Sequence, residues 1–236
     1  MTDAEATSYA PDDPLPGARS PRDAARQIPP GNHGLPPEKV LSLQRERLID
    51  AIVHVIGERG YTATSVEAVC KCAGVSTKAF YRSFRDIDDL FSTAFEIGKE
   101  ALFHKATTAF TTGGPEWQGR VRSALSSFLA TLAENPNLAR LCIVDAAIVY
   151  PSGTSLLVGA MSQSFQMFVE VSPTIDMPIP FEDLTTLVIG GIITRLYFYI
   201  LEGRTRDMPE LLEELTYFAL LPFIGPDAAA AQYRSL

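Results

Sequence analysis

The sequence predicts an all-α fold with a small N-terminal head of three helices, a long connecting helix and a larger helical body, about nine helices in total. Between Ser65 and Leu90 the chain has the pattern of a short helix, a Gly-containing turn and a second short helix. From Gly113 onward, apolar residues recur at helical spacing in blocks separated by Pro and Gly. A chain of 236 residues, 46% of them hydrophobic, is long enough to bury a sizeable core.

Composition divides the chain into four parts. Residues 1–37 contain 8 of the 17 prolines and little periodic apolar spacing, so we expect a disordered tail there. We expect a helix-turn-helix domain over residues 38–85, a helical effector-binding and dimerisation domain over residues 86–225, and a C-terminal tail over residues 226–236.

The first helix is expected from Glu38 to Arg59, with Gly60 ending it. Its buried stripe is formed by Leu48, Ile52, Val55 and Ile56. We expect this helix to support the helix-turn-helix.

Local signals define the turn of the helix-turn-helix. Gly74 can adopt the left-handed conformation that ends a helix, and Ser76 is a natural N-cap for the next one. Val75 and Phe80 flank this cap at the spacing of a hydrophobic staple. The second helix should therefore leave the turn in a defined direction.

The exposed face of that second helix consists of hydrogen-bond donors. They are Ser76, Thr77, Lys78, Tyr81 and Arg82. An isolated basic group would usually be a solvated face, but the helix-turn-helix context favours contact with DNA phosphates and base edges.

The charge distribution agrees with DNA binding by the head. The chain has a net charge of −8, yet residues 38–85 carry 8 Lys and Arg against 5 Asp and Glu, and residues 106–236 carry 7 against 13. Arg19, Arg22 and Arg26 lie in the N-terminal tail, where a minor-groove arm is conceivable. Five acidic residues dilute these arginines, so we favour a plain tail.

From Arg45 to Phe91 the chain resembles the tetracycline-repressor (TetR) family of bacterial transcriptional regulators. Arg45 with Leu48 and Ile49, the Gly60-Tyr61 pair before Thr64-Ser65-Val66, and Ala73-Gly74-Val75-Ser76 with Phe80-Tyr81 and Phe84 carry this resemblance. It adds Arg45, Thr64, Ser65 and Arg85 to the expected DNA-binding residues. It implies a ligand-responsive homodimeric repressor without enzymatic activity.

The sequence departs from the family pattern at two positions. Ser83 stands where the family often has His, and Ile87 stands where it usually has a Lys that meets a DNA phosphate. Arg85 could substitute for that Lys, or Ile87 could pack inward without compensation.

The body is expected to consist of successive helices. Asp86 can cap a long fourth helix that runs toward Phe103, and Asp207 with Pro209 and Glu210 forms a possible capping box for the last helix. After the fourth helix, helical blocks are expected over residues 116–134, 136–149, 154–171, 181–202 and 208–223, the last of these being the final helix.

The block that begins at Phe181 and ends at Glu202 is apolar nearly all round, so membrane insertion has to be considered. Arg195 lies in its middle, and a charge there is costly in lipid. With the final block, from Met208 to Phe223, it resembles the two helices through which the family forms a four-helix dimer interface. We therefore expect a homodimer that reads a palindromic operator with half-sites about 34 Å apart.

A small, mostly apolar effector is expected in the body, although aromatic and Met residues at helical spacing can equally be plain core. The candidate ligand-binding residues are Phe103, Phe128, Asp145, Phe165, Phe168, Arg195 and Tyr197. Asp145 and Arg195 are charges within apolar segments, and could pair with each other, bind a ligand or lie at the dimer seam.

No residue pattern indicates an enzyme, a metal site or a cofactor. His33, His54 and His104 lie apart, and the thiols of Cys70 and Cys72 would point to different faces of one helix. The start of the chain lacks the pattern of a signal peptide, so we expect a cytoplasmic protein. The alternative function is a helical ligand-binding or adaptor protein that has lost operator binding. Both a repressor and an activator are compatible with this sequence.

Overall fold

The computed structural model describes residues 13–26, 28, 34–149 and 179–234, and these residues form helices and turns without any strand. The all-α prediction is confirmed. The chain divides into two compact units, Met1–Ala101 with Arg140–Val149, and Leu102–Ala139 with Tyr150–Leu236. The helix expected over residues 154–171 lies outside the described residues.

Helix α1 (Pro37–Arg59) is the scaffold of the first unit. Its predicted stripe is confirmed, since each of the four side chains is at most 3% exposed. Gly60 ends the helix with φ of 76°, and its N–H donates to the carbonyl of Ile56 over 2.8 Å.

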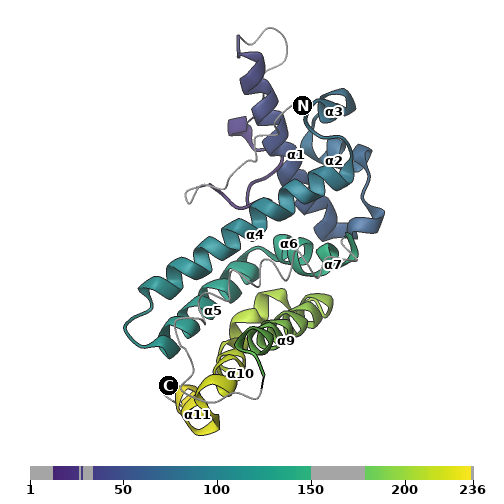
Figure 1. The fold of residues 1–236 in the computed structure, drawn as a ribbon. Helices are drawn as coiled ribbons and strands as arrows, with labels where there is room; N and C mark the ends of the chain where they lie inside the picture. Colours follow the sequence, from purple (N-terminus) through teal and green to yellow (C-terminus); the bar gives the residue numbers. More distant parts are fainter. Residues whose placement is uncertain (1–12, 27, 29–33, 150–178, 235–236) are drawn as a thin grey trace. The chain divides into compact units, whose positions relative to one another are not determined.

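Helices α2 (Val66–Ala73) and α3 (Thr77–Ser83) form the helix-turn-helix and pack against α1 (Figure 1). Gly74 has φ of 62° and ψ of 40°, and the Ser76 hydroxyl accepts a hydrogen bond from the N–H of Ala79 over 3.2 Å. Val75 and Phe80 are both buried, as the hydrophobic staple predicts. The local sequence signals for a left-handed glycine, a cap and a staple are therefore all realised at the turn.

Helix α4 (Ile87–Thr112) is capped by Asp86, whose carboxylate accepts from the N–H of Asp89 over 2.8 Å. The helix extends nine residues beyond the predicted Phe103, and Gly113 and Gly114 follow its end. It begins in the first unit and continues into the second.

The block predicted over residues 136–149 is helical but changes its winding. It consists of α6 (Pro136–Ala139), a π-helical turn (Arg140–Asp145) and α7 (Ala146–Val149). The π-helical turn belongs to the first unit and packs against α1, with Leu141 through Asp145 buried.

The second unit contains α5 (Trp117–Glu134), α9 (Phe181–Leu201), α10 (Leu212–Ile224) and α11 (Pro226–Arg234) (Figure 1). Helix α10 packs against α5, α9 and α11. Part of the core of this unit is aromatic: the centroid of the Phe223 ring lies 6.0 Å from that of Trp117 and 5.5 Å from that of Phe181.

Two predictions for the C-terminal end are wrong. Asp207 forms no capping box, because a 3₁₀ helix (Thr205–Leu211) contains Pro209 and Glu210, and α10 begins later without a side-chain cap. Asp207 instead pairs with Arg204 over 3.2 Å. Residues 226–234, expected as a tail, form α11, in which Ala229 is buried.

The N-terminal prediction also differs from the structure. Residues 13–26, hereafter the N-terminal strap, pack on α1 and bury Leu15, Pro16, Pro21 and Arg26. Arg26 of the strap pairs with Asp50 on α1, and Arg22 donates to backbone carbonyls of α2. The local composition of residues 13–26 does not reveal these distant partners. Residues 1–12 lie outside the described part of the chain.

Candidate nucleic-acid interface

Helix α3 separates a buried face from a polar exposed face. Ala79 and Phe80 are buried, and the Phe80 ring contacts the ring of Phe84 at 5.9 Å. The predicted contact residues are all exposed, namely Ser76, Thr77, Lys78, Tyr81 and Arg82. Tyr81 is 58% exposed although its ring edge packs on Phe80 at 5.2 Å. Donors on one anchored helix face suit hydrogen bonding to base edges and phosphates.

The predicted residues before α2 have structural roles as well. The Thr64 hydroxyl donates to the carbonyl of Gly60 over 2.9 Å, and the Ser65 hydroxyl accepts from the N–H of Ala68 over 3.2 Å. Thr64 is half-buried and Ser65 is exposed at the N-terminus of α2. Backbone N–H groups at a helix N-terminus favour an anionic partner such as a phosphate.

Two further predicted arginines lie near the junction of α3 and α4. The guanidinium of Arg45 stacks over the Phe84 ring at 5.0 Å, and burial lowers the pKa of Arg45 while the Asp89 carboxylate opposes this. Arg85 is exposed, with its Nε 3.5 Å from the same carboxylate. Ile87 is half-buried at the first turn of α4. Arg85 therefore supplies an exposed positive charge two residues before Ile87.

The predicted ligand-binding residues that the structure describes are divided between the two units. Phe103, Phe128 and Tyr197 are half-buried in the second unit, where the Tyr197 ring packs against Phe198 at 5.7 Å. Phe165 and Phe168 lie outside the described residues.

Each of the two charges predicted within apolar segments has an ion-pair partner within its own unit. Asp145, in the first unit, accepts from the N–H of Tyr61 over 2.8 Å and pairs with Arg140 over 3.1 Å. Arg195, in the second unit, forms a two-point contact with Glu214, at 2.8 and 3.3 Å. Asp145 is thus a buried charge with a compensating partner, whereas the Arg195 side chain is 40% exposed.

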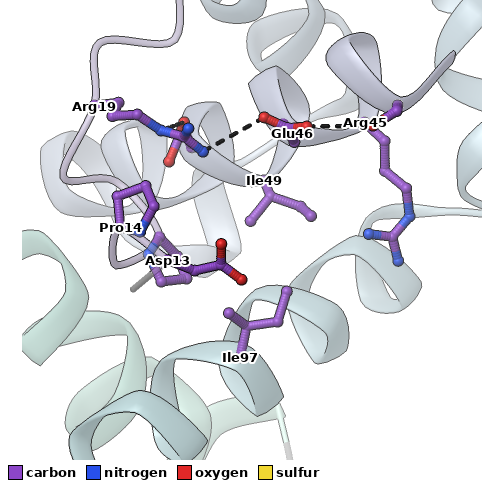
Figure 2. A pocket seen from close by; sticks show the side chains of 10 residues that line it. Asp13, Pro14, Arg19, Arg45, Glu46, Ile49 and Ile97 are labelled. Carbon is purple, nitrogen blue, oxygen red and sulfur yellow. Dashed lines mark hydrogen bonds and ion pairs between the residues drawn. The ribbon is translucent and has the colours of Figure 1, made fainter. Parts of the chain in front are cut away.

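A cavity of about 330 Å³ lies where the N-terminal strap, α1 and α4 meet (Figure 2). Pro14, Ile49 and Ile97 contribute apolar walls, while Arg19 and Glu46 face each other at 3.6 Å. None of the residues predicted to bind a ligand lines this cavity. Among the described residues, no cluster of three or more His, Cys, Asp or Glu side chains could hold a metal ion.

Sequence reasoning missed a set of charged residues under the helix-turn-helix. Asp50 and Arg47 are buried on α1, and Arg22 reaches α2 from the strap. A signal was present, since Asp50 interrupts an apolar run from Leu48 to Val53. Its partners are 24 to 33 positions away, and local patterns do not identify them.

A capped helix-turn-helix that exposes cations and hydroxyls on its second helix is typical of DNA-binding proteins. Residues 48–94 match the sequence model of the tetR family of bacterial regulatory proteins. This match over 47 of the 236 residues confirms the resemblance to the tetR family seen in the sequence of the helix-turn-helix region. Members of this family act by binding DNA, in agreement with the expected lack of enzymatic activity.

Solved structures of transcription regulators share the fold. The fatty acid degradation regulator FadR from Bacillus halodurans superimposes with a TM-score of 0.66 at 16% identity, covering 75% of this chain and 94% of that one. FadR from Bacillus subtilis, in complex with stearoyl-CoA, gives 0.65 at 19% identity, covering 78% and 98%. A TetR-like regulator from Rhodococcus sp. RHA1 gives 0.58 at 19% identity, covering 79% and 98%.

Proposed function

We propose that this chain is a cytoplasmic, homodimeric repressor that binds a palindromic operator and releases it when a small, mostly apolar molecule binds. The observation that carries the proposal is the exposed face of α3, which presents Thr77, Lys78, Tyr81 and Arg82 from a helix fixed by its cap and staple. Such a helix fits the DNA major groove, where donors distinguish base pairs.

Residues around α3 would hold the DNA backbone. We assign phosphate contacts to Arg85, Thr64 and Ser65, which lie beside helix N-termini in the same unit. Arg45 would support the interface by its stacking on Phe84. Ile87 supplies no charge, so each subunit should make one phosphate contact fewer than the family pattern implies.

Dimerisation is supported by apolar side chains left exposed on α9 and α10. Leu187, Phe198 and Leu201 on α9 and Phe218 on α10 are between 41% and 65% exposed. Grouped exposed apolar surface of this kind usually marks an interface. A Cβ added to Gly190 would meet no atom within 4 Å, so this position is open to the close approach of a second backbone.

Helix α9 is long and apolar enough to cross a membrane, and 33% of its most apolar 18-residue window is buried. Arg195 of this helix pairs with Glu214 of α10, and such an ion pair suits a water-exposed rim better than lipid. Two α9–α10 pairs related by a two-fold axis would place two recognition helices on a palindrome.

The effector proposal rests on the aromatic content of the body. Phe103, Phe128 and Tyr197 are half-buried candidates for contacts with the apolar part of the effector, and Arg195 is the candidate for its polar group. Phe165 and Phe168 are further candidates for apolar contacts. Asp145 would affect effector binding only through its structural role in the first unit. The Bacillus subtilis FadR structure contains stearoyl-CoA, which makes long-chain acyl compounds the first molecules to test. A coupling of about 1 to 3 kcal/mol between effector and DNA would change operator affinity by roughly 5- to 150-fold.

Selection of bound duplexes from a random-sequence pool tests the DNA part of the proposal. We expect a palindromic consensus whose binding falls steeply with salt and weakens when stearoyl-CoA is added. A pool that shows no enrichment would favour the alternative of a ligand-binding or adaptor protein without operator binding. Calorimetry with stearoyl-CoA on ligand-stripped protein would then show whether effector binding persists.

A further inference from the structure

The N-terminal strap is fitted to α1 by a close backbone contact. Gly17 has φ of 81°, and a Cβ added there would lie 2.5 Å from Cγ1 of Val53. Both the backbone conformation and the space require glycine at this position. The strap therefore packs on α1 in one defined position.

Asp50 on α1 holds the strap in this position. Its carboxylate accepts from the N–H of Gly17 over 2.7 Å and pairs with Nη1 of Arg26 over 2.6 Å. Nε of Arg19 lies 3.7 Å from the same carboxylate. Asp50 and Arg26 are both buried, so removing either one would leave the other with only a longer ion pair, Arg19 at 3.7 Å from Asp50 or Asp23 at 4.0 Å from Arg26.

A second group of contacts links the strap to the end of α2. The guanidinium of Arg22 donates to the carbonyls of Lys71 and Cys72. The guanidinium of Arg47 donates to the carbonyls of Ala73 and Gly74. The carbonyls at a helix C-terminus lack partners within the helix, and positive charge is favourable there. Two arginines thus satisfy the carbonyls that lead into the turn of the helix-turn-helix.

Arg47 also joins the two groups, because its Nε donates to the carbonyl of Pro21 in the strap over 3.0 Å. Strap, α1 and α2 are consequently held through one buried guanidinium. The direction of α3 depends on the turn at Gly74, which follows the carbonyls held by Arg22 and Arg47.

We infer that the N-terminal strap is a positioning element of the DNA-binding unit. Arg22, Arg47 and Asp50 are its positioning residues, and they fix the end of α2 and thereby the orientation of α3. This role differs from both the plain tail and the minor-groove arm considered from the sequence, and it rests on the contacts of Arg19, Arg22 and Arg26 with the chain itself. The expected effect of the strap on DNA affinity rests on the proposed function. Its expected effect on the stability of the turn does not.

Hydrogen exchange measures the structural consequence without DNA. Arg22→Ala should raise the exchange rates of the amides at the turn, Val75 and Phe80 among them, by about tenfold. Arg22→Lys retains a cation near the carbonyls and should restore much of the protection. Arg206→Ala, an exposed arginine of the second unit, is the control with the same change in charge. Unchanged exchange in Arg22→Ala would overturn the inference.

Binding to the duplex selected by the wild-type protein measures the functional consequence. We expect Arg22→Ala and Asp50→Asn to weaken binding by about tenfold and Arg22→Lys by much less. Weaker binding of Arg22→Ala with unchanged hydrogen exchange would overturn positioning and indicate a direct DNA contact. If the wild-type protein selects no duplex, the proposed function fails while hydrogen exchange still decides the role of the strap. Arg22 is exposed, so its variants should fold even if those of Asp50 do not.

Discussion

Asp145 accepts a hydrogen bond from the backbone N–H of Tyr61 over 2.8 Å, although 84 positions separate the two residues. The carboxylate is buried in the π-helical turn and pairs with Arg140. This contact attaches a late segment of the chain to the loop between α1 and α2, so Asp145 has a structural role in the first unit.

We expect Asp145→Ala to destabilise the protein by about 1 to 3 kcal/mol, because it leaves the Tyr61 N–H without its acceptor. Asp145→Asn keeps an acceptor oxygen and should cost less. Urea unfolding of both variants measures the difference, with the exposed Asp183→Ala as a control. Equal losses in the Ala and Asn variants would contradict the role of the hydrogen bond.

The same residue should make stability depend on pH. Burial raises the pKa of Asp145, while the Tyr61 N–H and Arg140 oppose the shift. A carboxyl whose pKa is higher in the folded state binds a proton more tightly there, so its contribution declines as pH rises from about 4 through the folded pKa. The wild-type protein should therefore lose stability relative to Asp145→Asn over that window, measured by urea unfolding at successive pH values. A constant difference would contradict the prediction.

Lys78→Ala and Tyr81→Ala should weaken binding to the selected duplex in different ways. Loss of a phosphate contact at Lys78 should lower the salt slope by about one per subunit, whereas loss of a base contact at Tyr81 should cost about 1 to 3 kcal/mol and relax sequence preference. Fluorescence anisotropy across a salt series separates the two effects. Binding by both variants at the wild-type level would exclude α3 as the recognition helix.

Ile87→Lys tests the departure from the family pattern by adding a charge. The side chain is half-buried at the start of α4, two residues after the exposed Arg85. We expect tighter binding and a salt slope steeper by about one per subunit. Ile87→Met is the matched neutral control, and an equal effect of both substitutions would show that packing is responsible.

Leu187→Asp should disrupt the proposed dimer. This side chain is 65% exposed on α9, so an aspartate there would be tolerated in a single chain but costly within an apolar interface. Light scattering after gel filtration should show a dimer for the wild-type protein and a monomer for the variant. Leu41→Asp, on α1, is the control and should remain dimeric. A monomeric wild-type protein would contradict the dimer proposal.

The cysteines should differ in reactivity. Burial raises the pKa of Cys142 to about 12, so roughly one thiol in ten thousand would be ionised at pH 8. Cys72 is half-buried and its pKa is raised as well, so we expect its thiol to be more accessible to reagents than the buried thiol of Cys142. Alkylation followed by mass spectrometry should label Cys72 at least tenfold faster than Cys142 in the folded protein, and both equally in urea. Rapid labelling of Cys142 without denaturant would contradict its burial.

Most helices could be predicted because their signals are local. A cap, a staple and a left-handed glycine act within five residues, so Ser76, Phe80 and Gly74 identify the position of the turn in the sequence. The capping box at Asp207 failed for a tertiary reason. Thr205, Met208 and Leu211 are buried, and the 3₁₀ helix that contains them packs against α5 and α9.

The sequence by itself determined the all-α class, the helix-turn-helix and the polar face of α3, since each depends on periodicity and capping along a short stretch of chain. The tertiary structure alone decided the contacts of Arg22, Asp50 and Asp145. Their partners are distant in sequence, and the energy of a buried charge depends on what folding brings beside it. For the same reason the N-terminal strap could be recognised only in the folded chain.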